Sequence, residues 1–194
     1  MLNRFVTNLP SATKKVLATS AALVSVKDPL TLIRAVARLH ALRQDFIFLH
    51  FGAEGDCSEQ ARALIQEHGL QQVYHLAGFR QNIEDLYSLF DIFVMASREE
   101  ALGSSVLDAF ALRIPVVSTN AGGLAELLDD QRGYLCETGD DDQMAAALQQ
   151  ALAHPVEAKL RADKAWHYVQ DYHDIGRMSA RYLAQFEQLV SQAQ

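Results

Sequence analysis

Two carboxylates on either side of a glycine–serine run are the residues of this chain best suited to chemistry. Glu100 and Asp108 flank the run from Gly103 to Ser105 in the segment SREEALGSSVLDAF. The apolar run FDIFVMAS directly precedes that segment and predicts a buried strand, so the glycine–serine run predicts the first turn of a helix. Backbone N–H groups in such a turn have no intrahelical partner and favour a phosphate.

The spacing of the two carboxylates predicts what accompanies that phosphate. Asp108 lies about one turn further into the helix than Ser104, and one turn is ~5.4 Å along the axis. This is comparable with the distance from a nucleotide phosphate to its ribose diol, whose two hydroxyls a carboxylate can bind. Glu100 precedes the helix, where a group attached to the phosphate would lie. The spacing therefore suits a nucleotide diphosphate that carries a sugar.

The elements that must position these residues follow a repeating rhythm of strand and helix. A helix is predicted over residues 30–42, because Asp28 and Pro29 form a cap and first-turn pair. Short apolar runs alternating with amphipathic helices predict an α/β fold, a Rossmann-like, doubly wound parallel sheet covered on both faces. The predicted strands are residues 15–24, 45–52, 72–78, 91–97 and 115–119.

The segments that follow these strands define a candidate site. In an open parallel sheet, ligands bind beyond the carboxyl ends of the strands. The segments SVKD, GAEGD, GFRQN, SREEALGSS and TNAGG all fall on that edge and contain most of the glycines that precede helices. Their charged candidates are Lys27, Arg80, Arg98, Glu99 and Glu100. The alternative is that polar, glycine-rich loops occur at this edge in any such fold.

The chain beyond residue 139 is predicted to be a helical tail. Asp140 opens an Ala-rich helix with two further aspartates, and we favour a helix cap over a metal site there. The histidines have no metal-ligand spacing, so no metal is expected. Four aromatic residues of the tail either face a missing partner or pack on this domain, and both alternatives stay open: Trp166, Tyr168, Tyr172 and Tyr182.

Composition sets the outer bounds. The chain has 194 residues, of which 49% are hydrophobic and 21% charged, and this favours one soluble globular domain. A net charge of −7 without a basic stripe argues against nucleic-acid binding. There is no apolar run of the ~20 residues that a membrane helix needs, and no signal-peptide pattern. Cys57 and Cys136 are isolated, so reduced thiols and a cytoplasmic location are expected.

The stretch SREEALGSSVLDAFALRIPVVSTNAGGLAELL resembles a family signature. It is similar to that of retaining, group 1 (family 4) nucleotide-sugar glycosyltransferases of the GT-B fold, whose form is S-x-x-E-G-F-G-x-x-x-x-E-A-x-A, then P-V-V, then G-G-x-x-E. The resemblance spans about residues 16–190. It implies that the chain is the C-terminal, donor-binding domain of such an enzyme, with a nucleotide sugar as substrate and no metal or other cofactor.

The resemblance also implies a role for each matching residue. Glu100, the catalytic candidate, contacts the donor sugar, Asp108 holds the ribose, and Lys27 neutralises the diphosphate. Phosphate binds at the helix start, which is formed by Gly103, Ser104 and Ser105. The pair Gly122 and Gly123 closes the donor pocket, and Arg80 borders the nucleobase.

Three positions depart from the family pattern. Ala22 stands where the family has a second diphosphate cation, an arginine, and either Arg80 or Arg98 is a candidate to compensate. Asp108 replaces a glutamate and is one methylene shorter. The sequence EALG replaces EGFG at residues 100–103.

The resemblance covers one of the two Rossmann-like domains of a GT-B enzyme. We therefore expect a single domain over residues 1–194, with a core at about 14–155 and helices at about 156–192, and an N-terminal acceptor domain supplied in cis or as a separate chain. Any association with a membrane surface is assigned to that missing half. The expected function is the donor-binding half of a glycosyltransferase. The alternatives are a non-catalytic nucleotide-binding module and half of a GT-B sugar-nucleotide epimerase.

Overall fold

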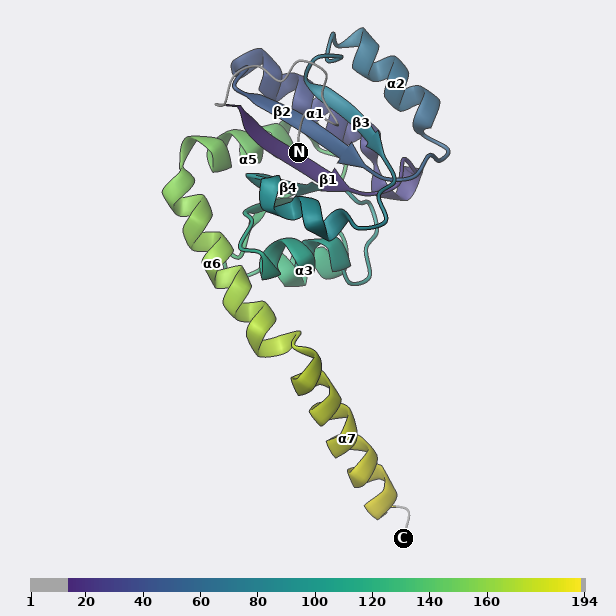
Figure 1. The fold of residues 1–194 in the computed structure, drawn as a ribbon, viewed down its shortest axis with the longest axis vertical. Coiled ribbons are helices and arrows are strands. Elements are labelled where there is room, and N and C mark those ends of the chain that lie inside the picture. Colours follow the sequence, from purple (N-terminus) through teal and green to yellow (C-terminus); the bar gives the residue numbers. More distant parts are fainter. Residues whose placement is uncertain (1–13, 193–194) are drawn as a thin grey trace.

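A computed structural model describes residues 14–192 and shows a parallel sheet between two layers of helices (Figure 1). Within these residues the sheet has six strands in the order β3-β2-β1-β4-β5-β6, and all neighbouring pairs are parallel. The strands are β1 (Lys15–Ser20), β2 (Phe46–Phe51), β3 (Tyr74–Gly78), β4 (Ile92–Met95), β5 (Val116–Thr119) and β6 (Tyr134–Cys136).

The two helical layers lie on opposite faces of the sheet, which confirms the doubly wound α/β fold. One buried cluster joins the sheet to α1 (Pro29–Leu42), α2 (Ser58–Glu67) and α5 (Asp141–Ala153). The other joins it to η3 (Ile83–Leu89), α3 (Ser104–Ala111), α4 (Gly123–Leu128) and the second half of α6 (Pro155–Tyr172). The strand order reverses between β1 and β4, so the switch point of the sheet lies at these two strands.

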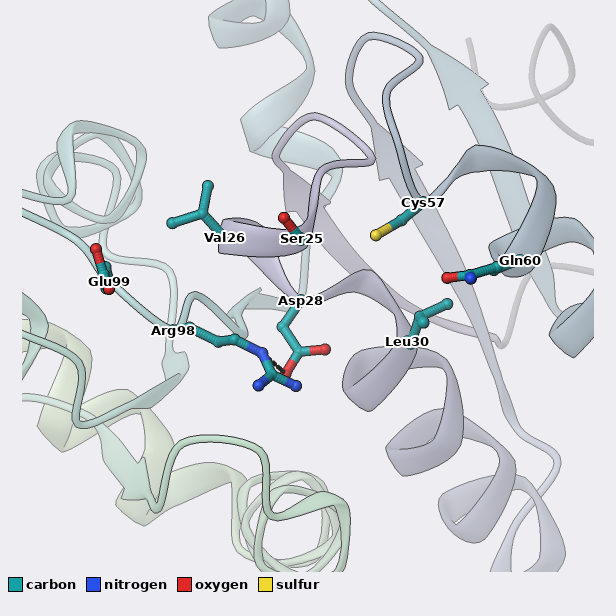
Figure 2. Close-up of a pocket in the computed structure, with 8 residues that line it drawn as sticks. All are labelled: Ser25, Val26, Asp28, Leu30, Cys57, Gln60, Arg98 and Glu99. Atoms are coloured by element: carbon teal, nitrogen blue, oxygen red, sulfur yellow. Dashed lines mark ion pairs between the residues drawn. The ribbon is translucent and has the colours of Figure 1, made fainter.

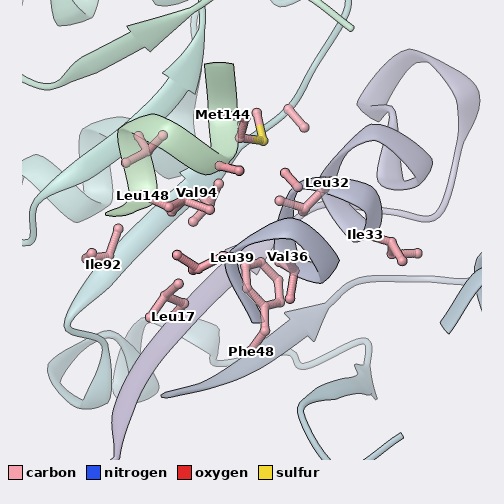
Figure 3. Packing of buried hydrophobic residues seen from close by; sticks show 14 of the residues in the cluster. Leu17, Leu32, Ile33, Val36, Leu39, Phe48, Ile92, Val94, Met144 and Leu148 are labelled. Carbon is pink, nitrogen blue, oxygen red and sulfur yellow. The ribbon is translucent and has the colours of Figure 1, made fainter. Parts of the chain in front are cut away.

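Strand β2 shows why the sheet is buried on both sides. All six residues of its sequence FIFLHF are buried, since successive side chains point into opposite layers. Phe48 belongs to the cluster with α1 and α5, where Leu39 and Met144 also lie (Figure 3), and Leu49 belongs to the other cluster. Full burial of each such side chain stabilises the fold by about 1.5–3 kcal/mol.

Two helix starts follow the sequence prediction. The Asp28 carboxylate accepts a hydrogen bond from the backbone N–H of Thr31 (3.2 Å), and Pro29 is the first residue of α1. Asp140 caps α5 by accepting a bond from the N–H of Gln143 (2.8 Å). The capping interpretation of Asp140 is therefore confirmed.

The predicted strand over residues 15–24 was too long. β1 ends at Ser20, and a short 3-10 helix, η2 (Ser25–Lys27), precedes α1. The backbone N–H of Leu23 donates to the carbonyl of Ala53 in the loop after β2 (2.9 Å), so this part of the chain pairs with a loop. The Leu23 side chain is nevertheless buried, which explains why the apolar run continues past the strand.

The tail divides into a packed helix and a projecting one. On α6, Trp166 and Tyr168 are partly buried, each with an arginine guanidinium (Arg113 and Arg132) 4.0 Å from its ring centroid. Tyr172 and Tyr182 are 54% and 56% exposed. Helix α7 (Ile175–Gln192) extends away from the sheet (Figure 1) and has no buried residue. Trp166 and Tyr168 thus pack on this domain, whereas Tyr172 and Tyr182 are exposed in it. Between residues 14 and 192 no helix is long and apolar enough to cross a membrane.

Candidate functional site

The switch point places Lys27 and Glu100 together. Lys27 ends η2 in the connection after β1, and Glu100 lies in the loop after β4, the strand paired with β1. The Lys27 ammonium forms an ion pair with Oε2 of Glu100, and their side chains are 27% and 16% exposed. The opposite charges of the two loops are thus held in a partly desolvated pair.

Further hydrogen bonds fix the loop that carries Glu100. The Ser97 hydroxyl donates a long bond to Oε2 of Glu100 (3.4 Å), and the Ser97 carbonyl accepts from the Thr119 hydroxyl at the end of β5 (2.7 Å). Both Ser97 and Thr119 are fully buried. The carboxylate of Glu100 is therefore tied to two neighbouring strands, β4 and β5.

The first turn of α3 has the geometry of an anion site. Gly103 precedes the helix with a φ of +74°, a left-handed conformation that favours glycine. In the described part of the chain, the backbone N–H groups of Gly103, Ser104 and Ser105 have no hydrogen-bond acceptor. The Tyr87 hydroxyl donates to the Ser105 carbonyl (3.1 Å) and holds this turn in place. Sequence reasoning did not identify Tyr87.

The glycine pair predicted to close the pocket lies against the backbone of the Glu100 loop. The N–H of Gly123 donates to the Glu100 carbonyl (2.9 Å). A Cβ on Gly122 would lie 2.3 Å from that same oxygen, and Gly122 has a φ of +50°. The absence of a side chain here allows the two loops to touch.

Asp108 lies on α3, one turn beyond the helix start, and is exposed. Partial desolvation of its carboxyl group, together with the charge of Glu84, raises the pKa of Asp108. Arg80 is also exposed but follows β3, which is separated from β1 by β2. The structure thus brings Lys27, Glu100 and the α3 turn together and places Arg80 two strands from β1.

Arg98 joins the same two loops on another side. Its Nε lies 2.9 Å from Oδ2 of Asp28, the buried residue that follows Lys27 (Figure 2). Its backbone N–H donates to the Val26 carbonyl (2.8 Å). The pair forms part of the wall of an open cavity of about 480 Å³, which is also lined by Ser25, Leu30, Cys57, Gln60 and Glu99.

A buried histidine supports the start of the β1 connection. Nε2–H of His50 donates to the Ala21 carbonyl (2.9 Å), and the Tyr74 hydroxyl donates to Nδ1 (2.7 Å). Burial lowers the pKa of His50 to about 4, so the neutral ring with both nitrogens bonded is the stable form. The sequence indicated only that His50 lies in a strand.

Between residues 14 and 192, no group of three or more His, Cys, Asp or Glu side chains is arranged to hold a metal ion.

The strand order and the paired loops at the switch point place the chain among the Rossmann-like α/β domains. Residues 3–165 match the family model for glycosyl transferases group 1, and the chain belongs to this family. The sequence resemblance is thereby confirmed.

Curated relatives are longer than this chain. It is 31% identical over 124 residues to a lipopolysaccharide core biosynthesis glycosyltransferase, LpsE, of Rhizobium meliloti, covering 63% of this chain and 35% of the relative. It is 28% identical over 163 residues to a 2-deoxystreptamine glucosyltransferase of Streptomyces kanamyceticus, covering 81% and 41%. The matched segments thus cover less than half of the length of these two relatives.

Solved structures share the fold. A C-terminal domain of a group 1 glycosyl transferase, LpcC of Francisella tularensis, superposes with a TM-score of 0.75 at 22% identity, covering 84% of this chain and 88% of that one. HepE of Anabaena, solved with UDP-glucose, gives a TM-score of 0.83 at 20% identity, covering 90% and 49%. The fold is that of the C-terminal half of a GT-B protein.

Proposed function

We propose that this chain is the donor-binding half of a retaining glycosyltransferase. It binds a nucleotide diphosphate sugar, and the sugar passes to an acceptor held by an N-terminal domain, in the same polypeptide or in a separate one. The observation that carries the proposal is the Lys27–Glu100 pair, which lies in the loops of β1 and β4 where the first turn of α3 begins. The fold shared with HepE, solved with UDP-glucose, supports the choice of ligand.

Each group has a defined task in this proposal. The diphosphate binds the N–H groups that open α3 and the Lys27 ammonium, while Asp108 accepts bonds from the ribose hydroxyls. Glu100 binds the donor sugar. When the bond between sugar and diphosphate breaks, negative charge grows on the leaving diphosphate, and Lys27 with the α3 dipole stabilises it. No metal is required for this step.

In this proposal, donor binding exchanges the ion pair between Lys27 and Glu100 for contacts of both side chains with the ligand. A diphosphate competes with Glu100 for Lys27, so the carboxylate becomes available for sugar hydroxyls as the ammonium turns to phosphate. Both side chains are partly desolvated, which makes their mutual attraction stronger than that of a surface pair. A ligand that supplies diphosphate and sugar together satisfies both groups.

A non-catalytic nucleotide-binding module is the second candidate. Ala22 favours it, because the family's second diphosphate cation is lacking at that position. The two candidates agree on the ligand and differ on turnover. Sugar transfer after restoration of an acceptor domain separates them, and consumption of sugar nucleotide without any acceptor would indicate an epimerase half.

Thermal shift and calorimetry test the shared part of the proposal. Uridine, guanosine and adenosine diphosphate sugars are compared with the free diphosphates and monophosphates. We expect at least one sugar nucleotide to raise the melting temperature more than its monophosphate does. Lys27→Met should remove most of that shift.

Lys15→Met is the matched control, since Lys15 pairs with Asp91 (2.8 Å) at the opposite edge of the sheet. The control should retain the shift. A complete panel without any shift at millimolar concentration would overturn donor binding by this half.

A further inference from the structure

We propose that Arg98 is a positioning residue that keeps Glu100 at the donor site when Lys27 binds the diphosphate. The inference rests on the proposed function and deepens it. It concerns the ion pair between Arg98 and Asp28, whereas the sequence named Arg98 only as one of two candidates to replace the diphosphate cation missing at Ala22. The pair lies one residue after Lys27 and two residues before Glu100, so it connects the two loops beside their functional side chains.

The anchor of this pair is well fixed. Asp28 is buried, its Oδ1 accepts from the Thr31 N–H (3.2 Å), and its Oδ2 accepts from the Thr31 hydroxyl (2.8 Å). Arg98 adds a charged donor to the same Oδ2 at 2.9 Å. A hydrogen bond between two charged groups is stronger than one between neutral groups. The loop of Glu100 is thus tied to the first residues of α1.

Other hydrogen bonds of the Glu100 loop connect it to β5 and α4, away from η2 and α1. Ser97 accepts from Thr119, and the Glu100 carbonyl accepts from Gly123, so both bonds lead toward β5 and α4. Toward η2, the side-chain ties are Lys27–Glu100 and Arg98–Asp28, supplemented by the backbone bond from Arg98 to Val26. The exchange proposed above opens the first of these pairs. Arg98 then holds the spacing between the loops.

Two variants separate positioning from general stability. Arg98→Met removes the charged donor but leaves both bonds from Thr31 to Asp28, so the cap of α1 persists. Arg98→Lys restores a cation without the planar fork of the guanidinium. Arg62→Met is the matched control, because Arg62 on α2 is similarly exposed (53% against 57%) and pairs at 2.5 Å with Glu54 in the loop after β2.

The decisive measurement compares the affinity for a sugar nucleotide with the affinity for its free diphosphate and takes the ratio of the two. The sugar nucleotide is the one that gives the largest thermal shift. Arg98→Met should lower this ratio about 5–10-fold, within the usual range of coupling between sites, and change the affinity for the diphosphate less. Arg98→Lys should lower the ratio less than Arg98→Met does, and Arg62→Met should leave it unchanged. Equal weakening of both ligands by Arg98→Met would show a merely structural role and overturn the inference.

Hydrogen exchange supplies a second readout that needs no ligand. Amides of residues 97–103 should exchange faster in Arg98→Met than in the wild type, while those of α1 stay protected. Unchanged exchange in residues 97–103 overturns the positioning role, whatever the ligand results. Failure of the wild type to bind any sugar nucleotide instead overturns the proposed function, so the two failures are distinguishable.

Discussion

Lys27 and Glu100 are 73 residues apart in the sequence and form an ion pair across the carboxyl edge of the sheet. The two groups have opposite charges, and their side chains are 27% and 16% exposed. A diphosphate that binds Lys27 must therefore compete with a carboxylate of the protein itself. This relationship changes what substitution of Glu100 is expected to do.

Glu100→Gln should raise the affinity for a free nucleoside diphosphate several-fold, because Lys27 loses its competing partner. The additional affinity contributed by the sugar should fall in the same variant. The sequence alone predicts an effect only on sugar-bearing ligands, since nothing in it indicates the ion pair. Calorimetry at two salt concentrations measures both effects.

Asp91→Asn is the control for Glu100→Gln, because it neutralises a carboxylate paired with Lys15 at the other edge of the sheet. It should leave both affinities unchanged. Weaker binding of the free diphosphate by Glu100→Gln would contradict the exchange.

Asp108→Ala should weaken the free diphosphate and the sugar nucleotide equally, by about 1–3 kcal/mol, because both ligands share the ribose that Asp108 is proposed to bind. Glu84→Gln is an informative companion, since Glu84 contributes to the raised pKa of Asp108. That change should lower the pKa and strengthen binding at acidic pH. An Asp108→Ala variant with unaltered affinity for both ligands would remove the ribose assignment.

Gly122→Ala should destabilise the fold by about 1–3 kcal/mol and weaken donor binding, because a Cβ would lie 2.3 Å from the Glu100 carbonyl oxygen. Gly139→Ala is the matched control, with a φ of +79° and nothing within 4 Å of its Cβ position. The control carries the strain of a positive φ without a steric clash, so it separates the two effects in Gly122→Ala. Denaturant unfolding and calorimetry should show a loss of ligand affinity for Gly122→Ala alone, and equal effects would contradict the close contact.

His50 should make the folded state weaker in acid. Its pKa is about 4 in the fold, against 6.5 ordinarily, so between these values the unfolded chain binds a proton that the fold excludes. The free energy of unfolding should fall by about 3 kcal/mol from this group as the pH drops through that window. His50→Phe should flatten the profile, and His68→Gln, which changes an exposed histidine after α2, is the control. A profile that stays steep in His50→Phe would point to other groups.

The 194 residues alone should not transfer sugar. Catalysis needs donor and acceptor held together in a site that excludes water, and in the proposed arrangement the opposite wall comes from another domain. Lys27 would otherwise act at high dielectric. Transfer of radiolabelled sugar to a broad acceptor mixture should appear only when an acceptor domain is fused or added. Robust turnover by the purified chain that depends on Glu100 would contradict this.

The sequence predicted the fold well because its signals are local. Apolar runs, the Asp28–Pro29 start of α1 and the Asp140 cap each depend on a few neighbouring residues. The rule that parallel strands end at one edge was enough to bring Lys27 and Glu100 to the same edge. The end of β1 was misplaced, because an apolar run does not show where sheet pairing stops.

The contacts inside the site could not be predicted in the same way. The pairs Lys27–Glu100 and Arg98–Asp28 join residues about 70 positions apart, and only side-chain packing decides that they meet. Tyr87 supports α3 from η3, which the sequence indicates only as a helical segment. His50 looked like any strand residue, since its two partners come from other parts of the chain.

Helix α7 has a consequence for how the protein unfolds. It has no buried residue, although Ile175, Leu183 and Phe186 are apolar and 59–74% exposed. Most helical stability in proteins comes from packing of an apolar face, and none of the 18 residues of α7 is buried. Loss of α7 therefore removes almost none of the contacts that hold the sheet, and we expect the two parts to unfold separately. Far-ultraviolet circular dichroism should report two melting events, and a bound ligand should raise the temperature of only the second.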